Sequence, residues 1–226
     1  MTWVKICGTT NLQDGQQSVA AGADALGFIF AESPRRASIE TAAAIVAALP
    51  HEVEAIGVFV NESPEHVAEI AQGAGLRGVQ LHGDEAAEQL PEFRRALGER
   101  KIIKALHARE LIDSSHDVLT RYLARRASID AILLDAGSPD QRGGTGVPFA
   151  WEKALPVAAA IRDAMPLIIA GGLTPENVAA AIELFQPYGV DVVSGVEIAA
   201  GRKHEARLRE FVAAARHARV SLKQRA

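Results

Sequence analysis

The chain has 226 residues, of which 48% are hydrophobic and 23% are charged. These fractions are those of a globular protein with one large or two small domains, and they argue against a disordered chain. The formal net charge of −4 gives no long-range attraction for nucleic acid or for an anionic membrane surface. With one cysteine, and with no signal peptide or membrane-spanning run, we expect a soluble cytoplasmic protein.

Short apolar runs alternate along the chain with alanine-rich amphipathic segments. The runs contain many β-branched residues and are bounded by Gly, Asp or Asn, which predicts buried parallel strands with helices between them. Eight such runs are present: Trp3–Cys7, Ala25–Phe30, Ala55–Val60, Gly78–Leu81, Ile102–Ala105, Ala131–Leu134, Leu167–Ala170 and Val190–Val193.

The number of runs bears on the fold class. Eight strand–helix units in 226 residues average about 28 residues each, as βα units with short loops require. The alternative is a doubly wound open sheet. The count of eight, and the absence of a Gly-x-Gly-x-x-Gly fingerprint after the first run, favour a closed (β/α)8 TIM barrel. We expect a single barrel domain over residues 1–226, with a basic C-terminal tail at about 217–226.

Some helix starts carry capping patterns. Thr10 with Gln13 has the form of a capping box, which predicts that the Thr10 hydroxyl caps the first helix. Ser63 and Thr174 each precede a proline, so we expect both to cap a helix with proline as its first residue.

The residues at the ends of the runs matter because a barrel holds its active site at the carboxyl ends of its strands. Cys7 ends the first run and Asp135 follows the sixth, so a thiol and a carboxyl are expected to face each other across the barrel mouth. Such a pair suits proton transfer on a carbonyl or imine without a metal or redox cofactor. Strand parity places Lys5 on the same face as Cys7, and we expect its charge to favour the thiolate by lowering the pKa of the thiol.

Glycine-rich loops follow three consecutive runs. Their backbone N–H groups, close to helix starts, are typical of a phosphate site in the last loops of a barrel, although tight turns alone would also explain the glycines. The candidate phosphate-binding residues are Gly144, Thr145 and Gly146 after the sixth run, Gly171 and Gly172 after the seventh, and Ser194 and Gly195 after the eighth.

Other polar residues at the mouth are candidates for binding the substrate. Arg35 and Arg36 follow the second run, and either could offer a bidentate fork to a carboxylate or phosphate. Gln80 and His82 lie at the end of the fourth run, where His82 could be a pocket wall, an acid–base group or a satisfied histidine. No second His or Cys is placed to form a metal site with His82.

These motifs together resemble the phosphoribosylanthranilate isomerase family of tryptophan biosynthesis, from Lys5 to about Phe211. No single motif is specific, but the ordered set is. It consists of Val4–Gly8, Gly22–Phe30, Ser33–Arg35, Gly57–Asn61, Val79–Gly83, Leu134–Asp135, Gly143–Gly146, Ala170–Asn177 and Ser194–Glu197.

The resemblance implies a cofactor-free Amadori rearrangement of N-(5-phosphoribosyl)anthranilate to 1-(2-carboxyphenylamino)-1-deoxyribulose 5-phosphate. It implies that Asp135 is the general acid and Cys7 the general base, and that Arg35 holds the anthranilate carboxylate. Arg36 stands where the family often has an aromatic residue, so the choice between the two arginines stays open. The expected partner is a phosphosugar substrate, and the protein is expected to be a monomer or a homodimer.

Two other functions fit parts of the pattern. A different phosphosugar barrel, such as the Amadori isomerase of histidine biosynthesis, would perform similar chemistry, but that family has Asp where this chain has Cys7. A binding barrel or regulatory pseudoenzyme would need a disrupted pocket, whereas both an acid and a base are present here.

Overall fold

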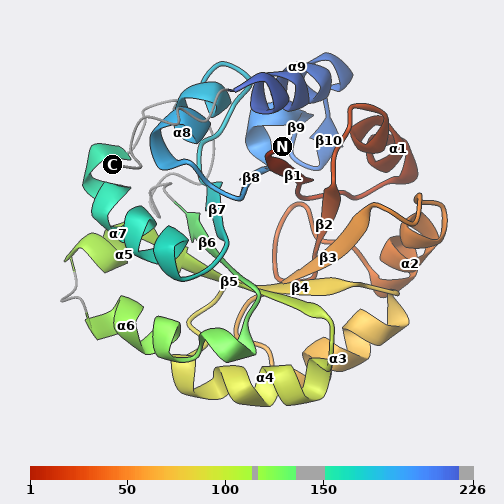
Figure 1. Cartoon of the computed structure of the whole chain (residues 1–226). Coiled ribbons are helices and arrows are strands. Elements are labelled where there is room, and N and C mark those ends of the chain that lie inside the picture. The colour runs from red at the N-terminus through yellow and green to blue at the C-terminus, as the bar shows by residue number, and fades with distance from the viewer. Residues whose placement is uncertain (114–116, 136–150, 219–226) are drawn as a thin grey trace.

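The structure is a computed structural model that describes residues 1–113, 117–135 and 151–218. Eight parallel strands follow one another around a closed barrel in chain order, and β1 pairs with both β2 and β8. Figure 1 shows helices arranged as a ring outside this barrel. The predicted (β/α)8 barrel is therefore confirmed, and the open doubly wound sheet is excluded.

The strands match the apolar runs closely. The runs at 78–81 and 167–170 coincide with strands, and the others differ by at most two residues at either end. The strands are β1 (Trp3–Ile6), β2 (Ala25–Ile29), β3 (Glu54–Phe59), β4 (Gly78–Leu81), β5 (Lys101–His107), β6 (Ala131–Asp135), β7 (Leu167–Ala170) and β8 (Gly189–Val192).

Within the described residues, the connections after β5 and after β8 depart from a simple strand–helix alternation. Two helices, α5 and α6, follow β5, and a two-stranded antiparallel hairpin of β9 (Glu197–Ala199) and β10 (Arg202–Lys203) precedes the last helix. The helices are α1 (Leu12–Ala20), α2 (Ile39–Ala47), α3 (Pro64–Gly73), α4 (Leu90–Leu97), α5 (Ala108–Asp113), α6 (Asp117–Ala124), α7 (Trp151–Ala164), α8 (Val178–Phe185) and α9 (Glu205–His217).

One of the three expected helix caps is confirmed. The Ser63 hydroxyl accepts a hydrogen bond from the backbone N–H of His66 at the start of α3. The prediction for Thr10 is wrong, because α1 is capped by Asn11, and the Thr10 hydroxyl instead donates to the Gly201 carbonyl in the hairpin. A carboxamide is as good a cap as a hydroxyl, so adjacent candidates compete for the position.

The prediction for Thr174 is also wrong. Helix α8 begins at Val178, and the residues between them form a turn in which the backbone N–H of Thr174 donates to Asn177 Oδ1 over 2.8 Å. Asn177 Nδ2 then donates to the Gly172 carbonyl, so this side chain closes the loop that follows β7.

Strand parity separates two hydrophobic clusters. The larger lies between the sheet and the helices, whereas the smaller fills the barrel from Trp3, Ala25, Ile56, Ile103, Ala105, Ala131, Leu133, Ile168 and Ala170. Alternate residues of a strand share a face, so Lys5 and Cys7 lie inside the barrel with Trp3. By the same parity Asp135 follows Leu133 on the inner face, and the expected inward placement of the acid and the thiol is confirmed.

Candidate active site

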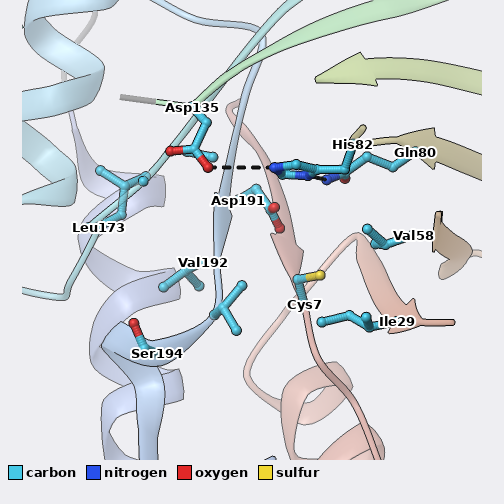
Figure 2. A pocket seen from close by; sticks show the side chains of 14 residues that line it. Cys7, Ile29, Val58, Gln80, His82, Asp135, Leu173, Asp191, Val192 and Ser194 are labelled. Atoms are coloured by element: carbon cyan, nitrogen blue, oxygen red, sulfur yellow. Dashed lines mark hydrogen bonds and ion pairs between the residues drawn. The ribbon is translucent and has the colours of Figure 1, made fainter. Parts of the chain in front are cut away.

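A pocket opens at the carboxyl ends of the barrel strands. Figure 2 shows the side chains of Cys7, His82, Asp135 and Asp191 directed toward one space. Ile29, Val58, Leu173 and Val192 supply apolar wall, and the lining also contains the predicted site residues Gln80, Gly171, Gly172 and Ser194.

Cys7 lies directly after β1, and its residue is only 3% exposed. Its backbone N–H donates to the Val192 carbonyl of β8, which fixes the end of the strand. Gly27 of β2 packs against the thiol so closely that an added Cβ would lie 2.5 Å from Sγ. The absence of a side chain at Gly27 therefore makes the space that the sulfur occupies.

Lys5 is fully buried below Cys7 and forms an ion pair with Asp191 of β8, with 2.9 Å between Nζ and Oδ1. Burial alone would lower the pKa of Lys5, but Asp191 and Cys7 raise it above its ordinary value. Lys5 is thus a cation next to the thiol, as strand parity predicts, but its charge is balanced by a carboxylate.

Lys5 acts on the thiol pKa in the expected direction, but the expected net lowering is wrong. Burial raises the pKa of Cys7 above its ordinary value; Asp191 also raises it, while Lys5 and Lys203 oppose the shift without reversing it. Desolvation disfavours the charged form of any acid, and here it outweighs two nearby ammonium groups.

Asp135 lies at the other side of the pocket, beside a pair of polar side chains from the end of β4. His82 Nε2 is 3.7 Å from Asp135 Oδ2, and Gln80 Nε2 is 2.7 Å from His82 Nδ1. An amide nitrogen only donates, so His82 Nδ1 accepts and its ring proton sits on Nε2, facing Asp135. Gln80 Oε1 is buried and has no hydrogen-bond partner within the described residues, so it is available to a ligand N–H or O–H.

The loops after β7 and β8 approach each other at the mouth. Gly171 and Gly172 have φ of 90° and 66°, a region that residues with side chains rarely adopt. An added Cβ at Gly195 would lie 1.9 Å from the Leu173 carbonyl oxygen, so this close approach requires glycine. Ser194 lines the pocket beside them. The predicted phosphate residues Gly144, Thr145 and Gly146 lie outside the described residues.

Of the two candidate arginines, Arg35 is held by Glu197 and lies outside the pocket lining. Arg35 Nε lies 3.0 Å from each oxygen of Glu197, and Arg35 Nη2 lies 2.7 Å from Oε2. Burial would raise the pKa of Glu197, but Arg35 and Lys203 lower it below its ordinary value. Arg36 is exposed and pairs with Ile29 through its main chain.

Three charged residues at or beside the site were not predicted to act there: Asp191 lines the pocket, and Glu197 and Lys203 lie behind Cys7. Asp191 interrupts the apolar run of β8, and this interruption was an available signal, since Lys5 interrupts β1 in the same way. Glu197 and Lys203 come from the β9–β10 hairpin, where no periodic pattern marks a strand. Among the residues that the structure describes, no group of three or more His, Cys, Asp or Glu side chains is placed to hold a metal ion.

The fold and the pocket define a class of protein, a (β/α)8-barrel enzyme with acid–base groups at the carboxyl ends of its strands. The family model for N-(5'-phosphoribosyl)anthranilate (PRA) isomerase matches residues 4–214. The chain belongs to this family. That membership also decides against the isomerase of histidine biosynthesis and against a pseudoenzyme as the better description.

Curated relatives of high identity carry the same name. The chain is similar to N-(5'-phosphoribosyl)anthranilate isomerase of Geobacter sulfurreducens, with 49% identity over 94% of this chain and 97% of the relative. It is 44% identical to the enzyme named likewise in Rubrobacter xylanophilus, over 96% of this chain and all of the relative.

Solved structures agree with the fold. The chain resembles phosphoribosyl anthranilate isomerase from Thermotoga maritima with a TM-score of 0.80 and 41% identity, over 96% of this chain and 99% of that one. It also resembles a phosphoribosyl anthranilate isomerase in complex with reduced 1-(o-carboxyphenylamino)-1-deoxyribulose 5-phosphate, with a TM-score of 0.78, 38% identity and the same coverage. None of the helices within the described ranges is long and apolar enough to cross a membrane.

Proposed function

We propose that this protein isomerises N-(5-phosphoribosyl)anthranilate with Cys7 as general base and Asp135 as general acid. The observation that carries the proposal is the pocket itself, which is lined by both a thiol and a carboxyl at the carboxyl ends of the strands. An aldose–ketose isomerisation of this kind needs one group to give a proton and one to remove a proton, and it needs no net oxidation.

The reaction balances without a cofactor. Asp135 donates a proton to the furanose ring oxygen as the bond from that oxygen to C1′ breaks, and the anthranilate nitrogen forms a protonated Schiff base with C1′. The Cys7 thiolate then removes the proton from C2′, and the electron pair of that bond forms the C1′=C2′ bond of an enolamine. Tautomerisation, with a proton added at C1′ and one lost from the C2′ hydroxyl, gives the ketone product.

The remaining groups are suited to hold the two anionic ends of the substrate. Backbone N–H groups of Gly171, Gly172 and Gly195, with the Ser194 hydroxyl, would bind the phosphate, together with the predicted loop residues Gly144, Thr145 and Gly146. Arg35 would bind the anthranilate carboxylate, because Nε and Nη2 are on Glu197 while Nη1 makes no hydrogen bond to the part of the chain that the structure describes. The half-buried position of Arg35 favours it over the exposed Arg36.

Gln80 and His82 would contact the sugar. Gln80 Oε1, which has no hydrogen-bond partner among the residues that the structure describes, can accept a hydrogen bond from a substrate hydroxyl or amine. His82 Nε2–H faces Asp135 Oδ2, and it would orient the acid toward the ring oxygen. The cytoplasmic location, the monomeric or homodimeric state and the extent of the domain over residues 1–226 stay predictions from the sequence.

The test is turnover of phosphoribosylanthranilate, followed by the change in anthranilate fluorescence with a metal chelator present. Cys7→Ser and Asp135→Asn should each lose about 100-fold or more in kcat, the usual contribution of a general acid or base, while circular dichroism stays native. Near wild-type turnover in either variant would refute that residue's role, and loss of turnover caused by the chelator would refute a metal-free reaction.

A further inference from the structure

Lys203 is a buried lysine whose charge the reaction above does not use. Its side chain is 0% exposed, and Nζ donates to the carbonyl oxygen of Cys7 and to Glu197 Oε1. It reaches this position from β10, 196 residues along the chain from Cys7. Burial lowers the pKa of Lys203 below its ordinary value and Arg35 adds to this effect, whereas Glu197 and Cys7 oppose the shift without reversing it and so support its ammonium form.

Glu197 lies between Lys203 and Arg35 and serves both. Its side chain is 4% exposed, with Oε1 3.0 Å from Lys203 Nζ and Oε2 2.7 Å from Arg35 Nη2. One carboxylate therefore balances two cations. The contacts form a continuous path from the candidate carboxylate-binding arginine to the main chain of the candidate base.

Charged groups from several elements surround Cys7. They are Lys5 on β1, Asp191 on β8, Lys203 on β10 and Glu197 on β9, with Arg35 on the far side of Glu197 and the buried Asp14 of α1 against the Lys203 backbone. Lys5 is paired with Asp191, whereas Lys203 and Arg35 share the Glu197 carboxylate. Lys203 is therefore a second cation, after Lys5, that opposes the raised pKa of the thiol.

The hairpin is fixed firmly enough to hold this arrangement. The Lys203 backbone N–H donates to Asp14 Oδ2 over 2.9 Å, and the Thr10 hydroxyl donates to the Gly201 carbonyl over 2.7 Å. The Gly201 backbone N–H donates to Glu197 Oε1, so the turn of the hairpin also orients the carboxylate. Both charged side chains are thus set by contacts with the first helix and the turn.

We propose that Lys203 and Glu197 are positioning residues of this isomerase. They determine the electrostatic environment of Cys7, and their contacts connect the main chain of Cys7 to the carboxylate-binding Arg35. This inference rests on the proposed role of Cys7. Removal of the two charges must then act on the thiol in opposite directions. Loss of Lys203 removes a nearby cation and disfavours the thiolate. Loss of the Glu197 charge leaves the Cys7 thiolate as an anion that supports the ammonium form of Lys203, so the thiolate and this cation favour each other more strongly.

The experiment titrates Cys7 in the folded full-length protein by thiolate ultraviolet absorbance, with Cys7→Ser as the blank. Cys7 is the only cysteine, so the signal belongs to one group. Lys203→Met should move the midpoint of the Cys7 titration to higher pH, and Glu197→Gln should move it to lower pH. Lys203→Arg should return the midpoint toward wild type, because the positive charge is restored.

Turnover supplies the second readout. In Lys203→Met, kcat at neutral pH should fall about tenfold, the effect that one displaced charge commonly has on an ionisation equilibrium, and should recover as pH rises. In Glu197→Gln, KM should rise because Arg35 loses the group that orients it. If the hairpin had only a structural role, both variants would lose activity, but their Cys7 titration midpoints would not move in opposite directions.

Lys101→Met is the matched control. Lys101 is also an ion-paired lysine, bound to Glu54, but it lies at the amino-terminal end of β5, away from the pocket. The midpoint of the Cys7 titration and the kcat of Lys101→Met should equal those of wild type.

The proposal is overturned if Lys203→Met leaves the thiol midpoint unchanged, or if both hairpin variants shift it in the same direction. If Lys203→Met does not fold, the proposal is tested with Lys203→Arg and Glu197→Gln. An unchanged midpoint of the Cys7 titration in Glu197→Gln then overturns it. Activity retained in Cys7→Ser would instead refute the proposed base while leaving the titration result intact.

Discussion

Gly27→Ala should slow catalysis because it displaces Cys7, the proposed base, and not because it disrupts the fold as a whole. The added Cβ would lie 2.5 Å from Cys7 Sγ, 3.0 Å from Cys7 Cβ and 3.1 Å from Cys7 Cα. Favourable contacts between such atoms begin at about 3.5 Å, so the sulfur must withdraw by about 1 Å. A displacement of about 1 Å in a catalytic group can cost about 100-fold in rate, which corresponds to about 2.7 kcal/mol in the activation barrier.

The assay is kcat/KM for phosphoribosylanthranilate, measured well below the unfolding temperature of each variant. Overpacking the barrel should also cost about 1–3 kcal/mol in the free energy of unfolding, so thermal unfolding is measured in parallel. Gly73→Ala is the control, because Gly73 ends α3 in the outer ring and, among the described residues, its Cβ would meet only Ile39 Cγ2, at 3.2 Å. Gly27→Ala with kcat/KM close to wild type would refute the view that Gly27 sets the position of the thiol.

Two further predictions concern buried charges. Lys104→Met should lower the free energy of unfolding by about 3 kcal/mol, because it leaves the buried Glu85 carboxylate, 2.8 Å from Lys104 Nζ, without its cation. Thermal unfolding should show this loss and should show part of it restored in Lys104→Met/Glu85→Gln; an unchanged Tm in the single variant would contradict it. Because the pKa of Glu197 is lowered in the folded protein, its contribution to stability is present above its unfolded pKa of about 4.3 and is lost as pH falls through the folded value. The difference in unfolding free energy between wild type and Glu197→Gln should therefore shrink in acid, as denaturant titrations at several pH values would measure, and a difference that does not change with pH would contradict the assigned sign.

The barrel could be predicted from the sequence because its strands are buried on both faces. Such strands appear as continuous apolar runs, and eight of them in chain order leave few alternatives. The hairpin of β9 and β10 could not be predicted in this way. It is short, partly exposed and carries Glu197 and Lys203 where a longer strand would carry apolar residues.

The positions of several site residues could be predicted from the sequence for a related reason. Parallel strands end at one edge of the barrel, so Cys7, His82 and Asp135 meet in one pocket although their chain positions are far apart. Strand parity placed Lys5 correctly beside Cys7. It could not give the sign of the thiol pKa shift, because that depends first on how deeply the thiol is buried and then on Asp191, which is 186 residues from Lys5 along the chain.

The raised pKa of Cys7 has two opposing effects on a general base. A thiolate with higher proton affinity removes the C2′ proton more readily, but a smaller fraction of the enzyme carries that thiolate near neutral pH. The ammonium groups of Lys5 and Lys203 limit the second effect without removing the first. kcat should therefore rise with pH until the thiolate is fully formed, and this rising limb should follow the thiol titration in every variant that leaves Asp135 intact. A rising limb that stays in place while the thiol midpoint moves would mean that another group is the base.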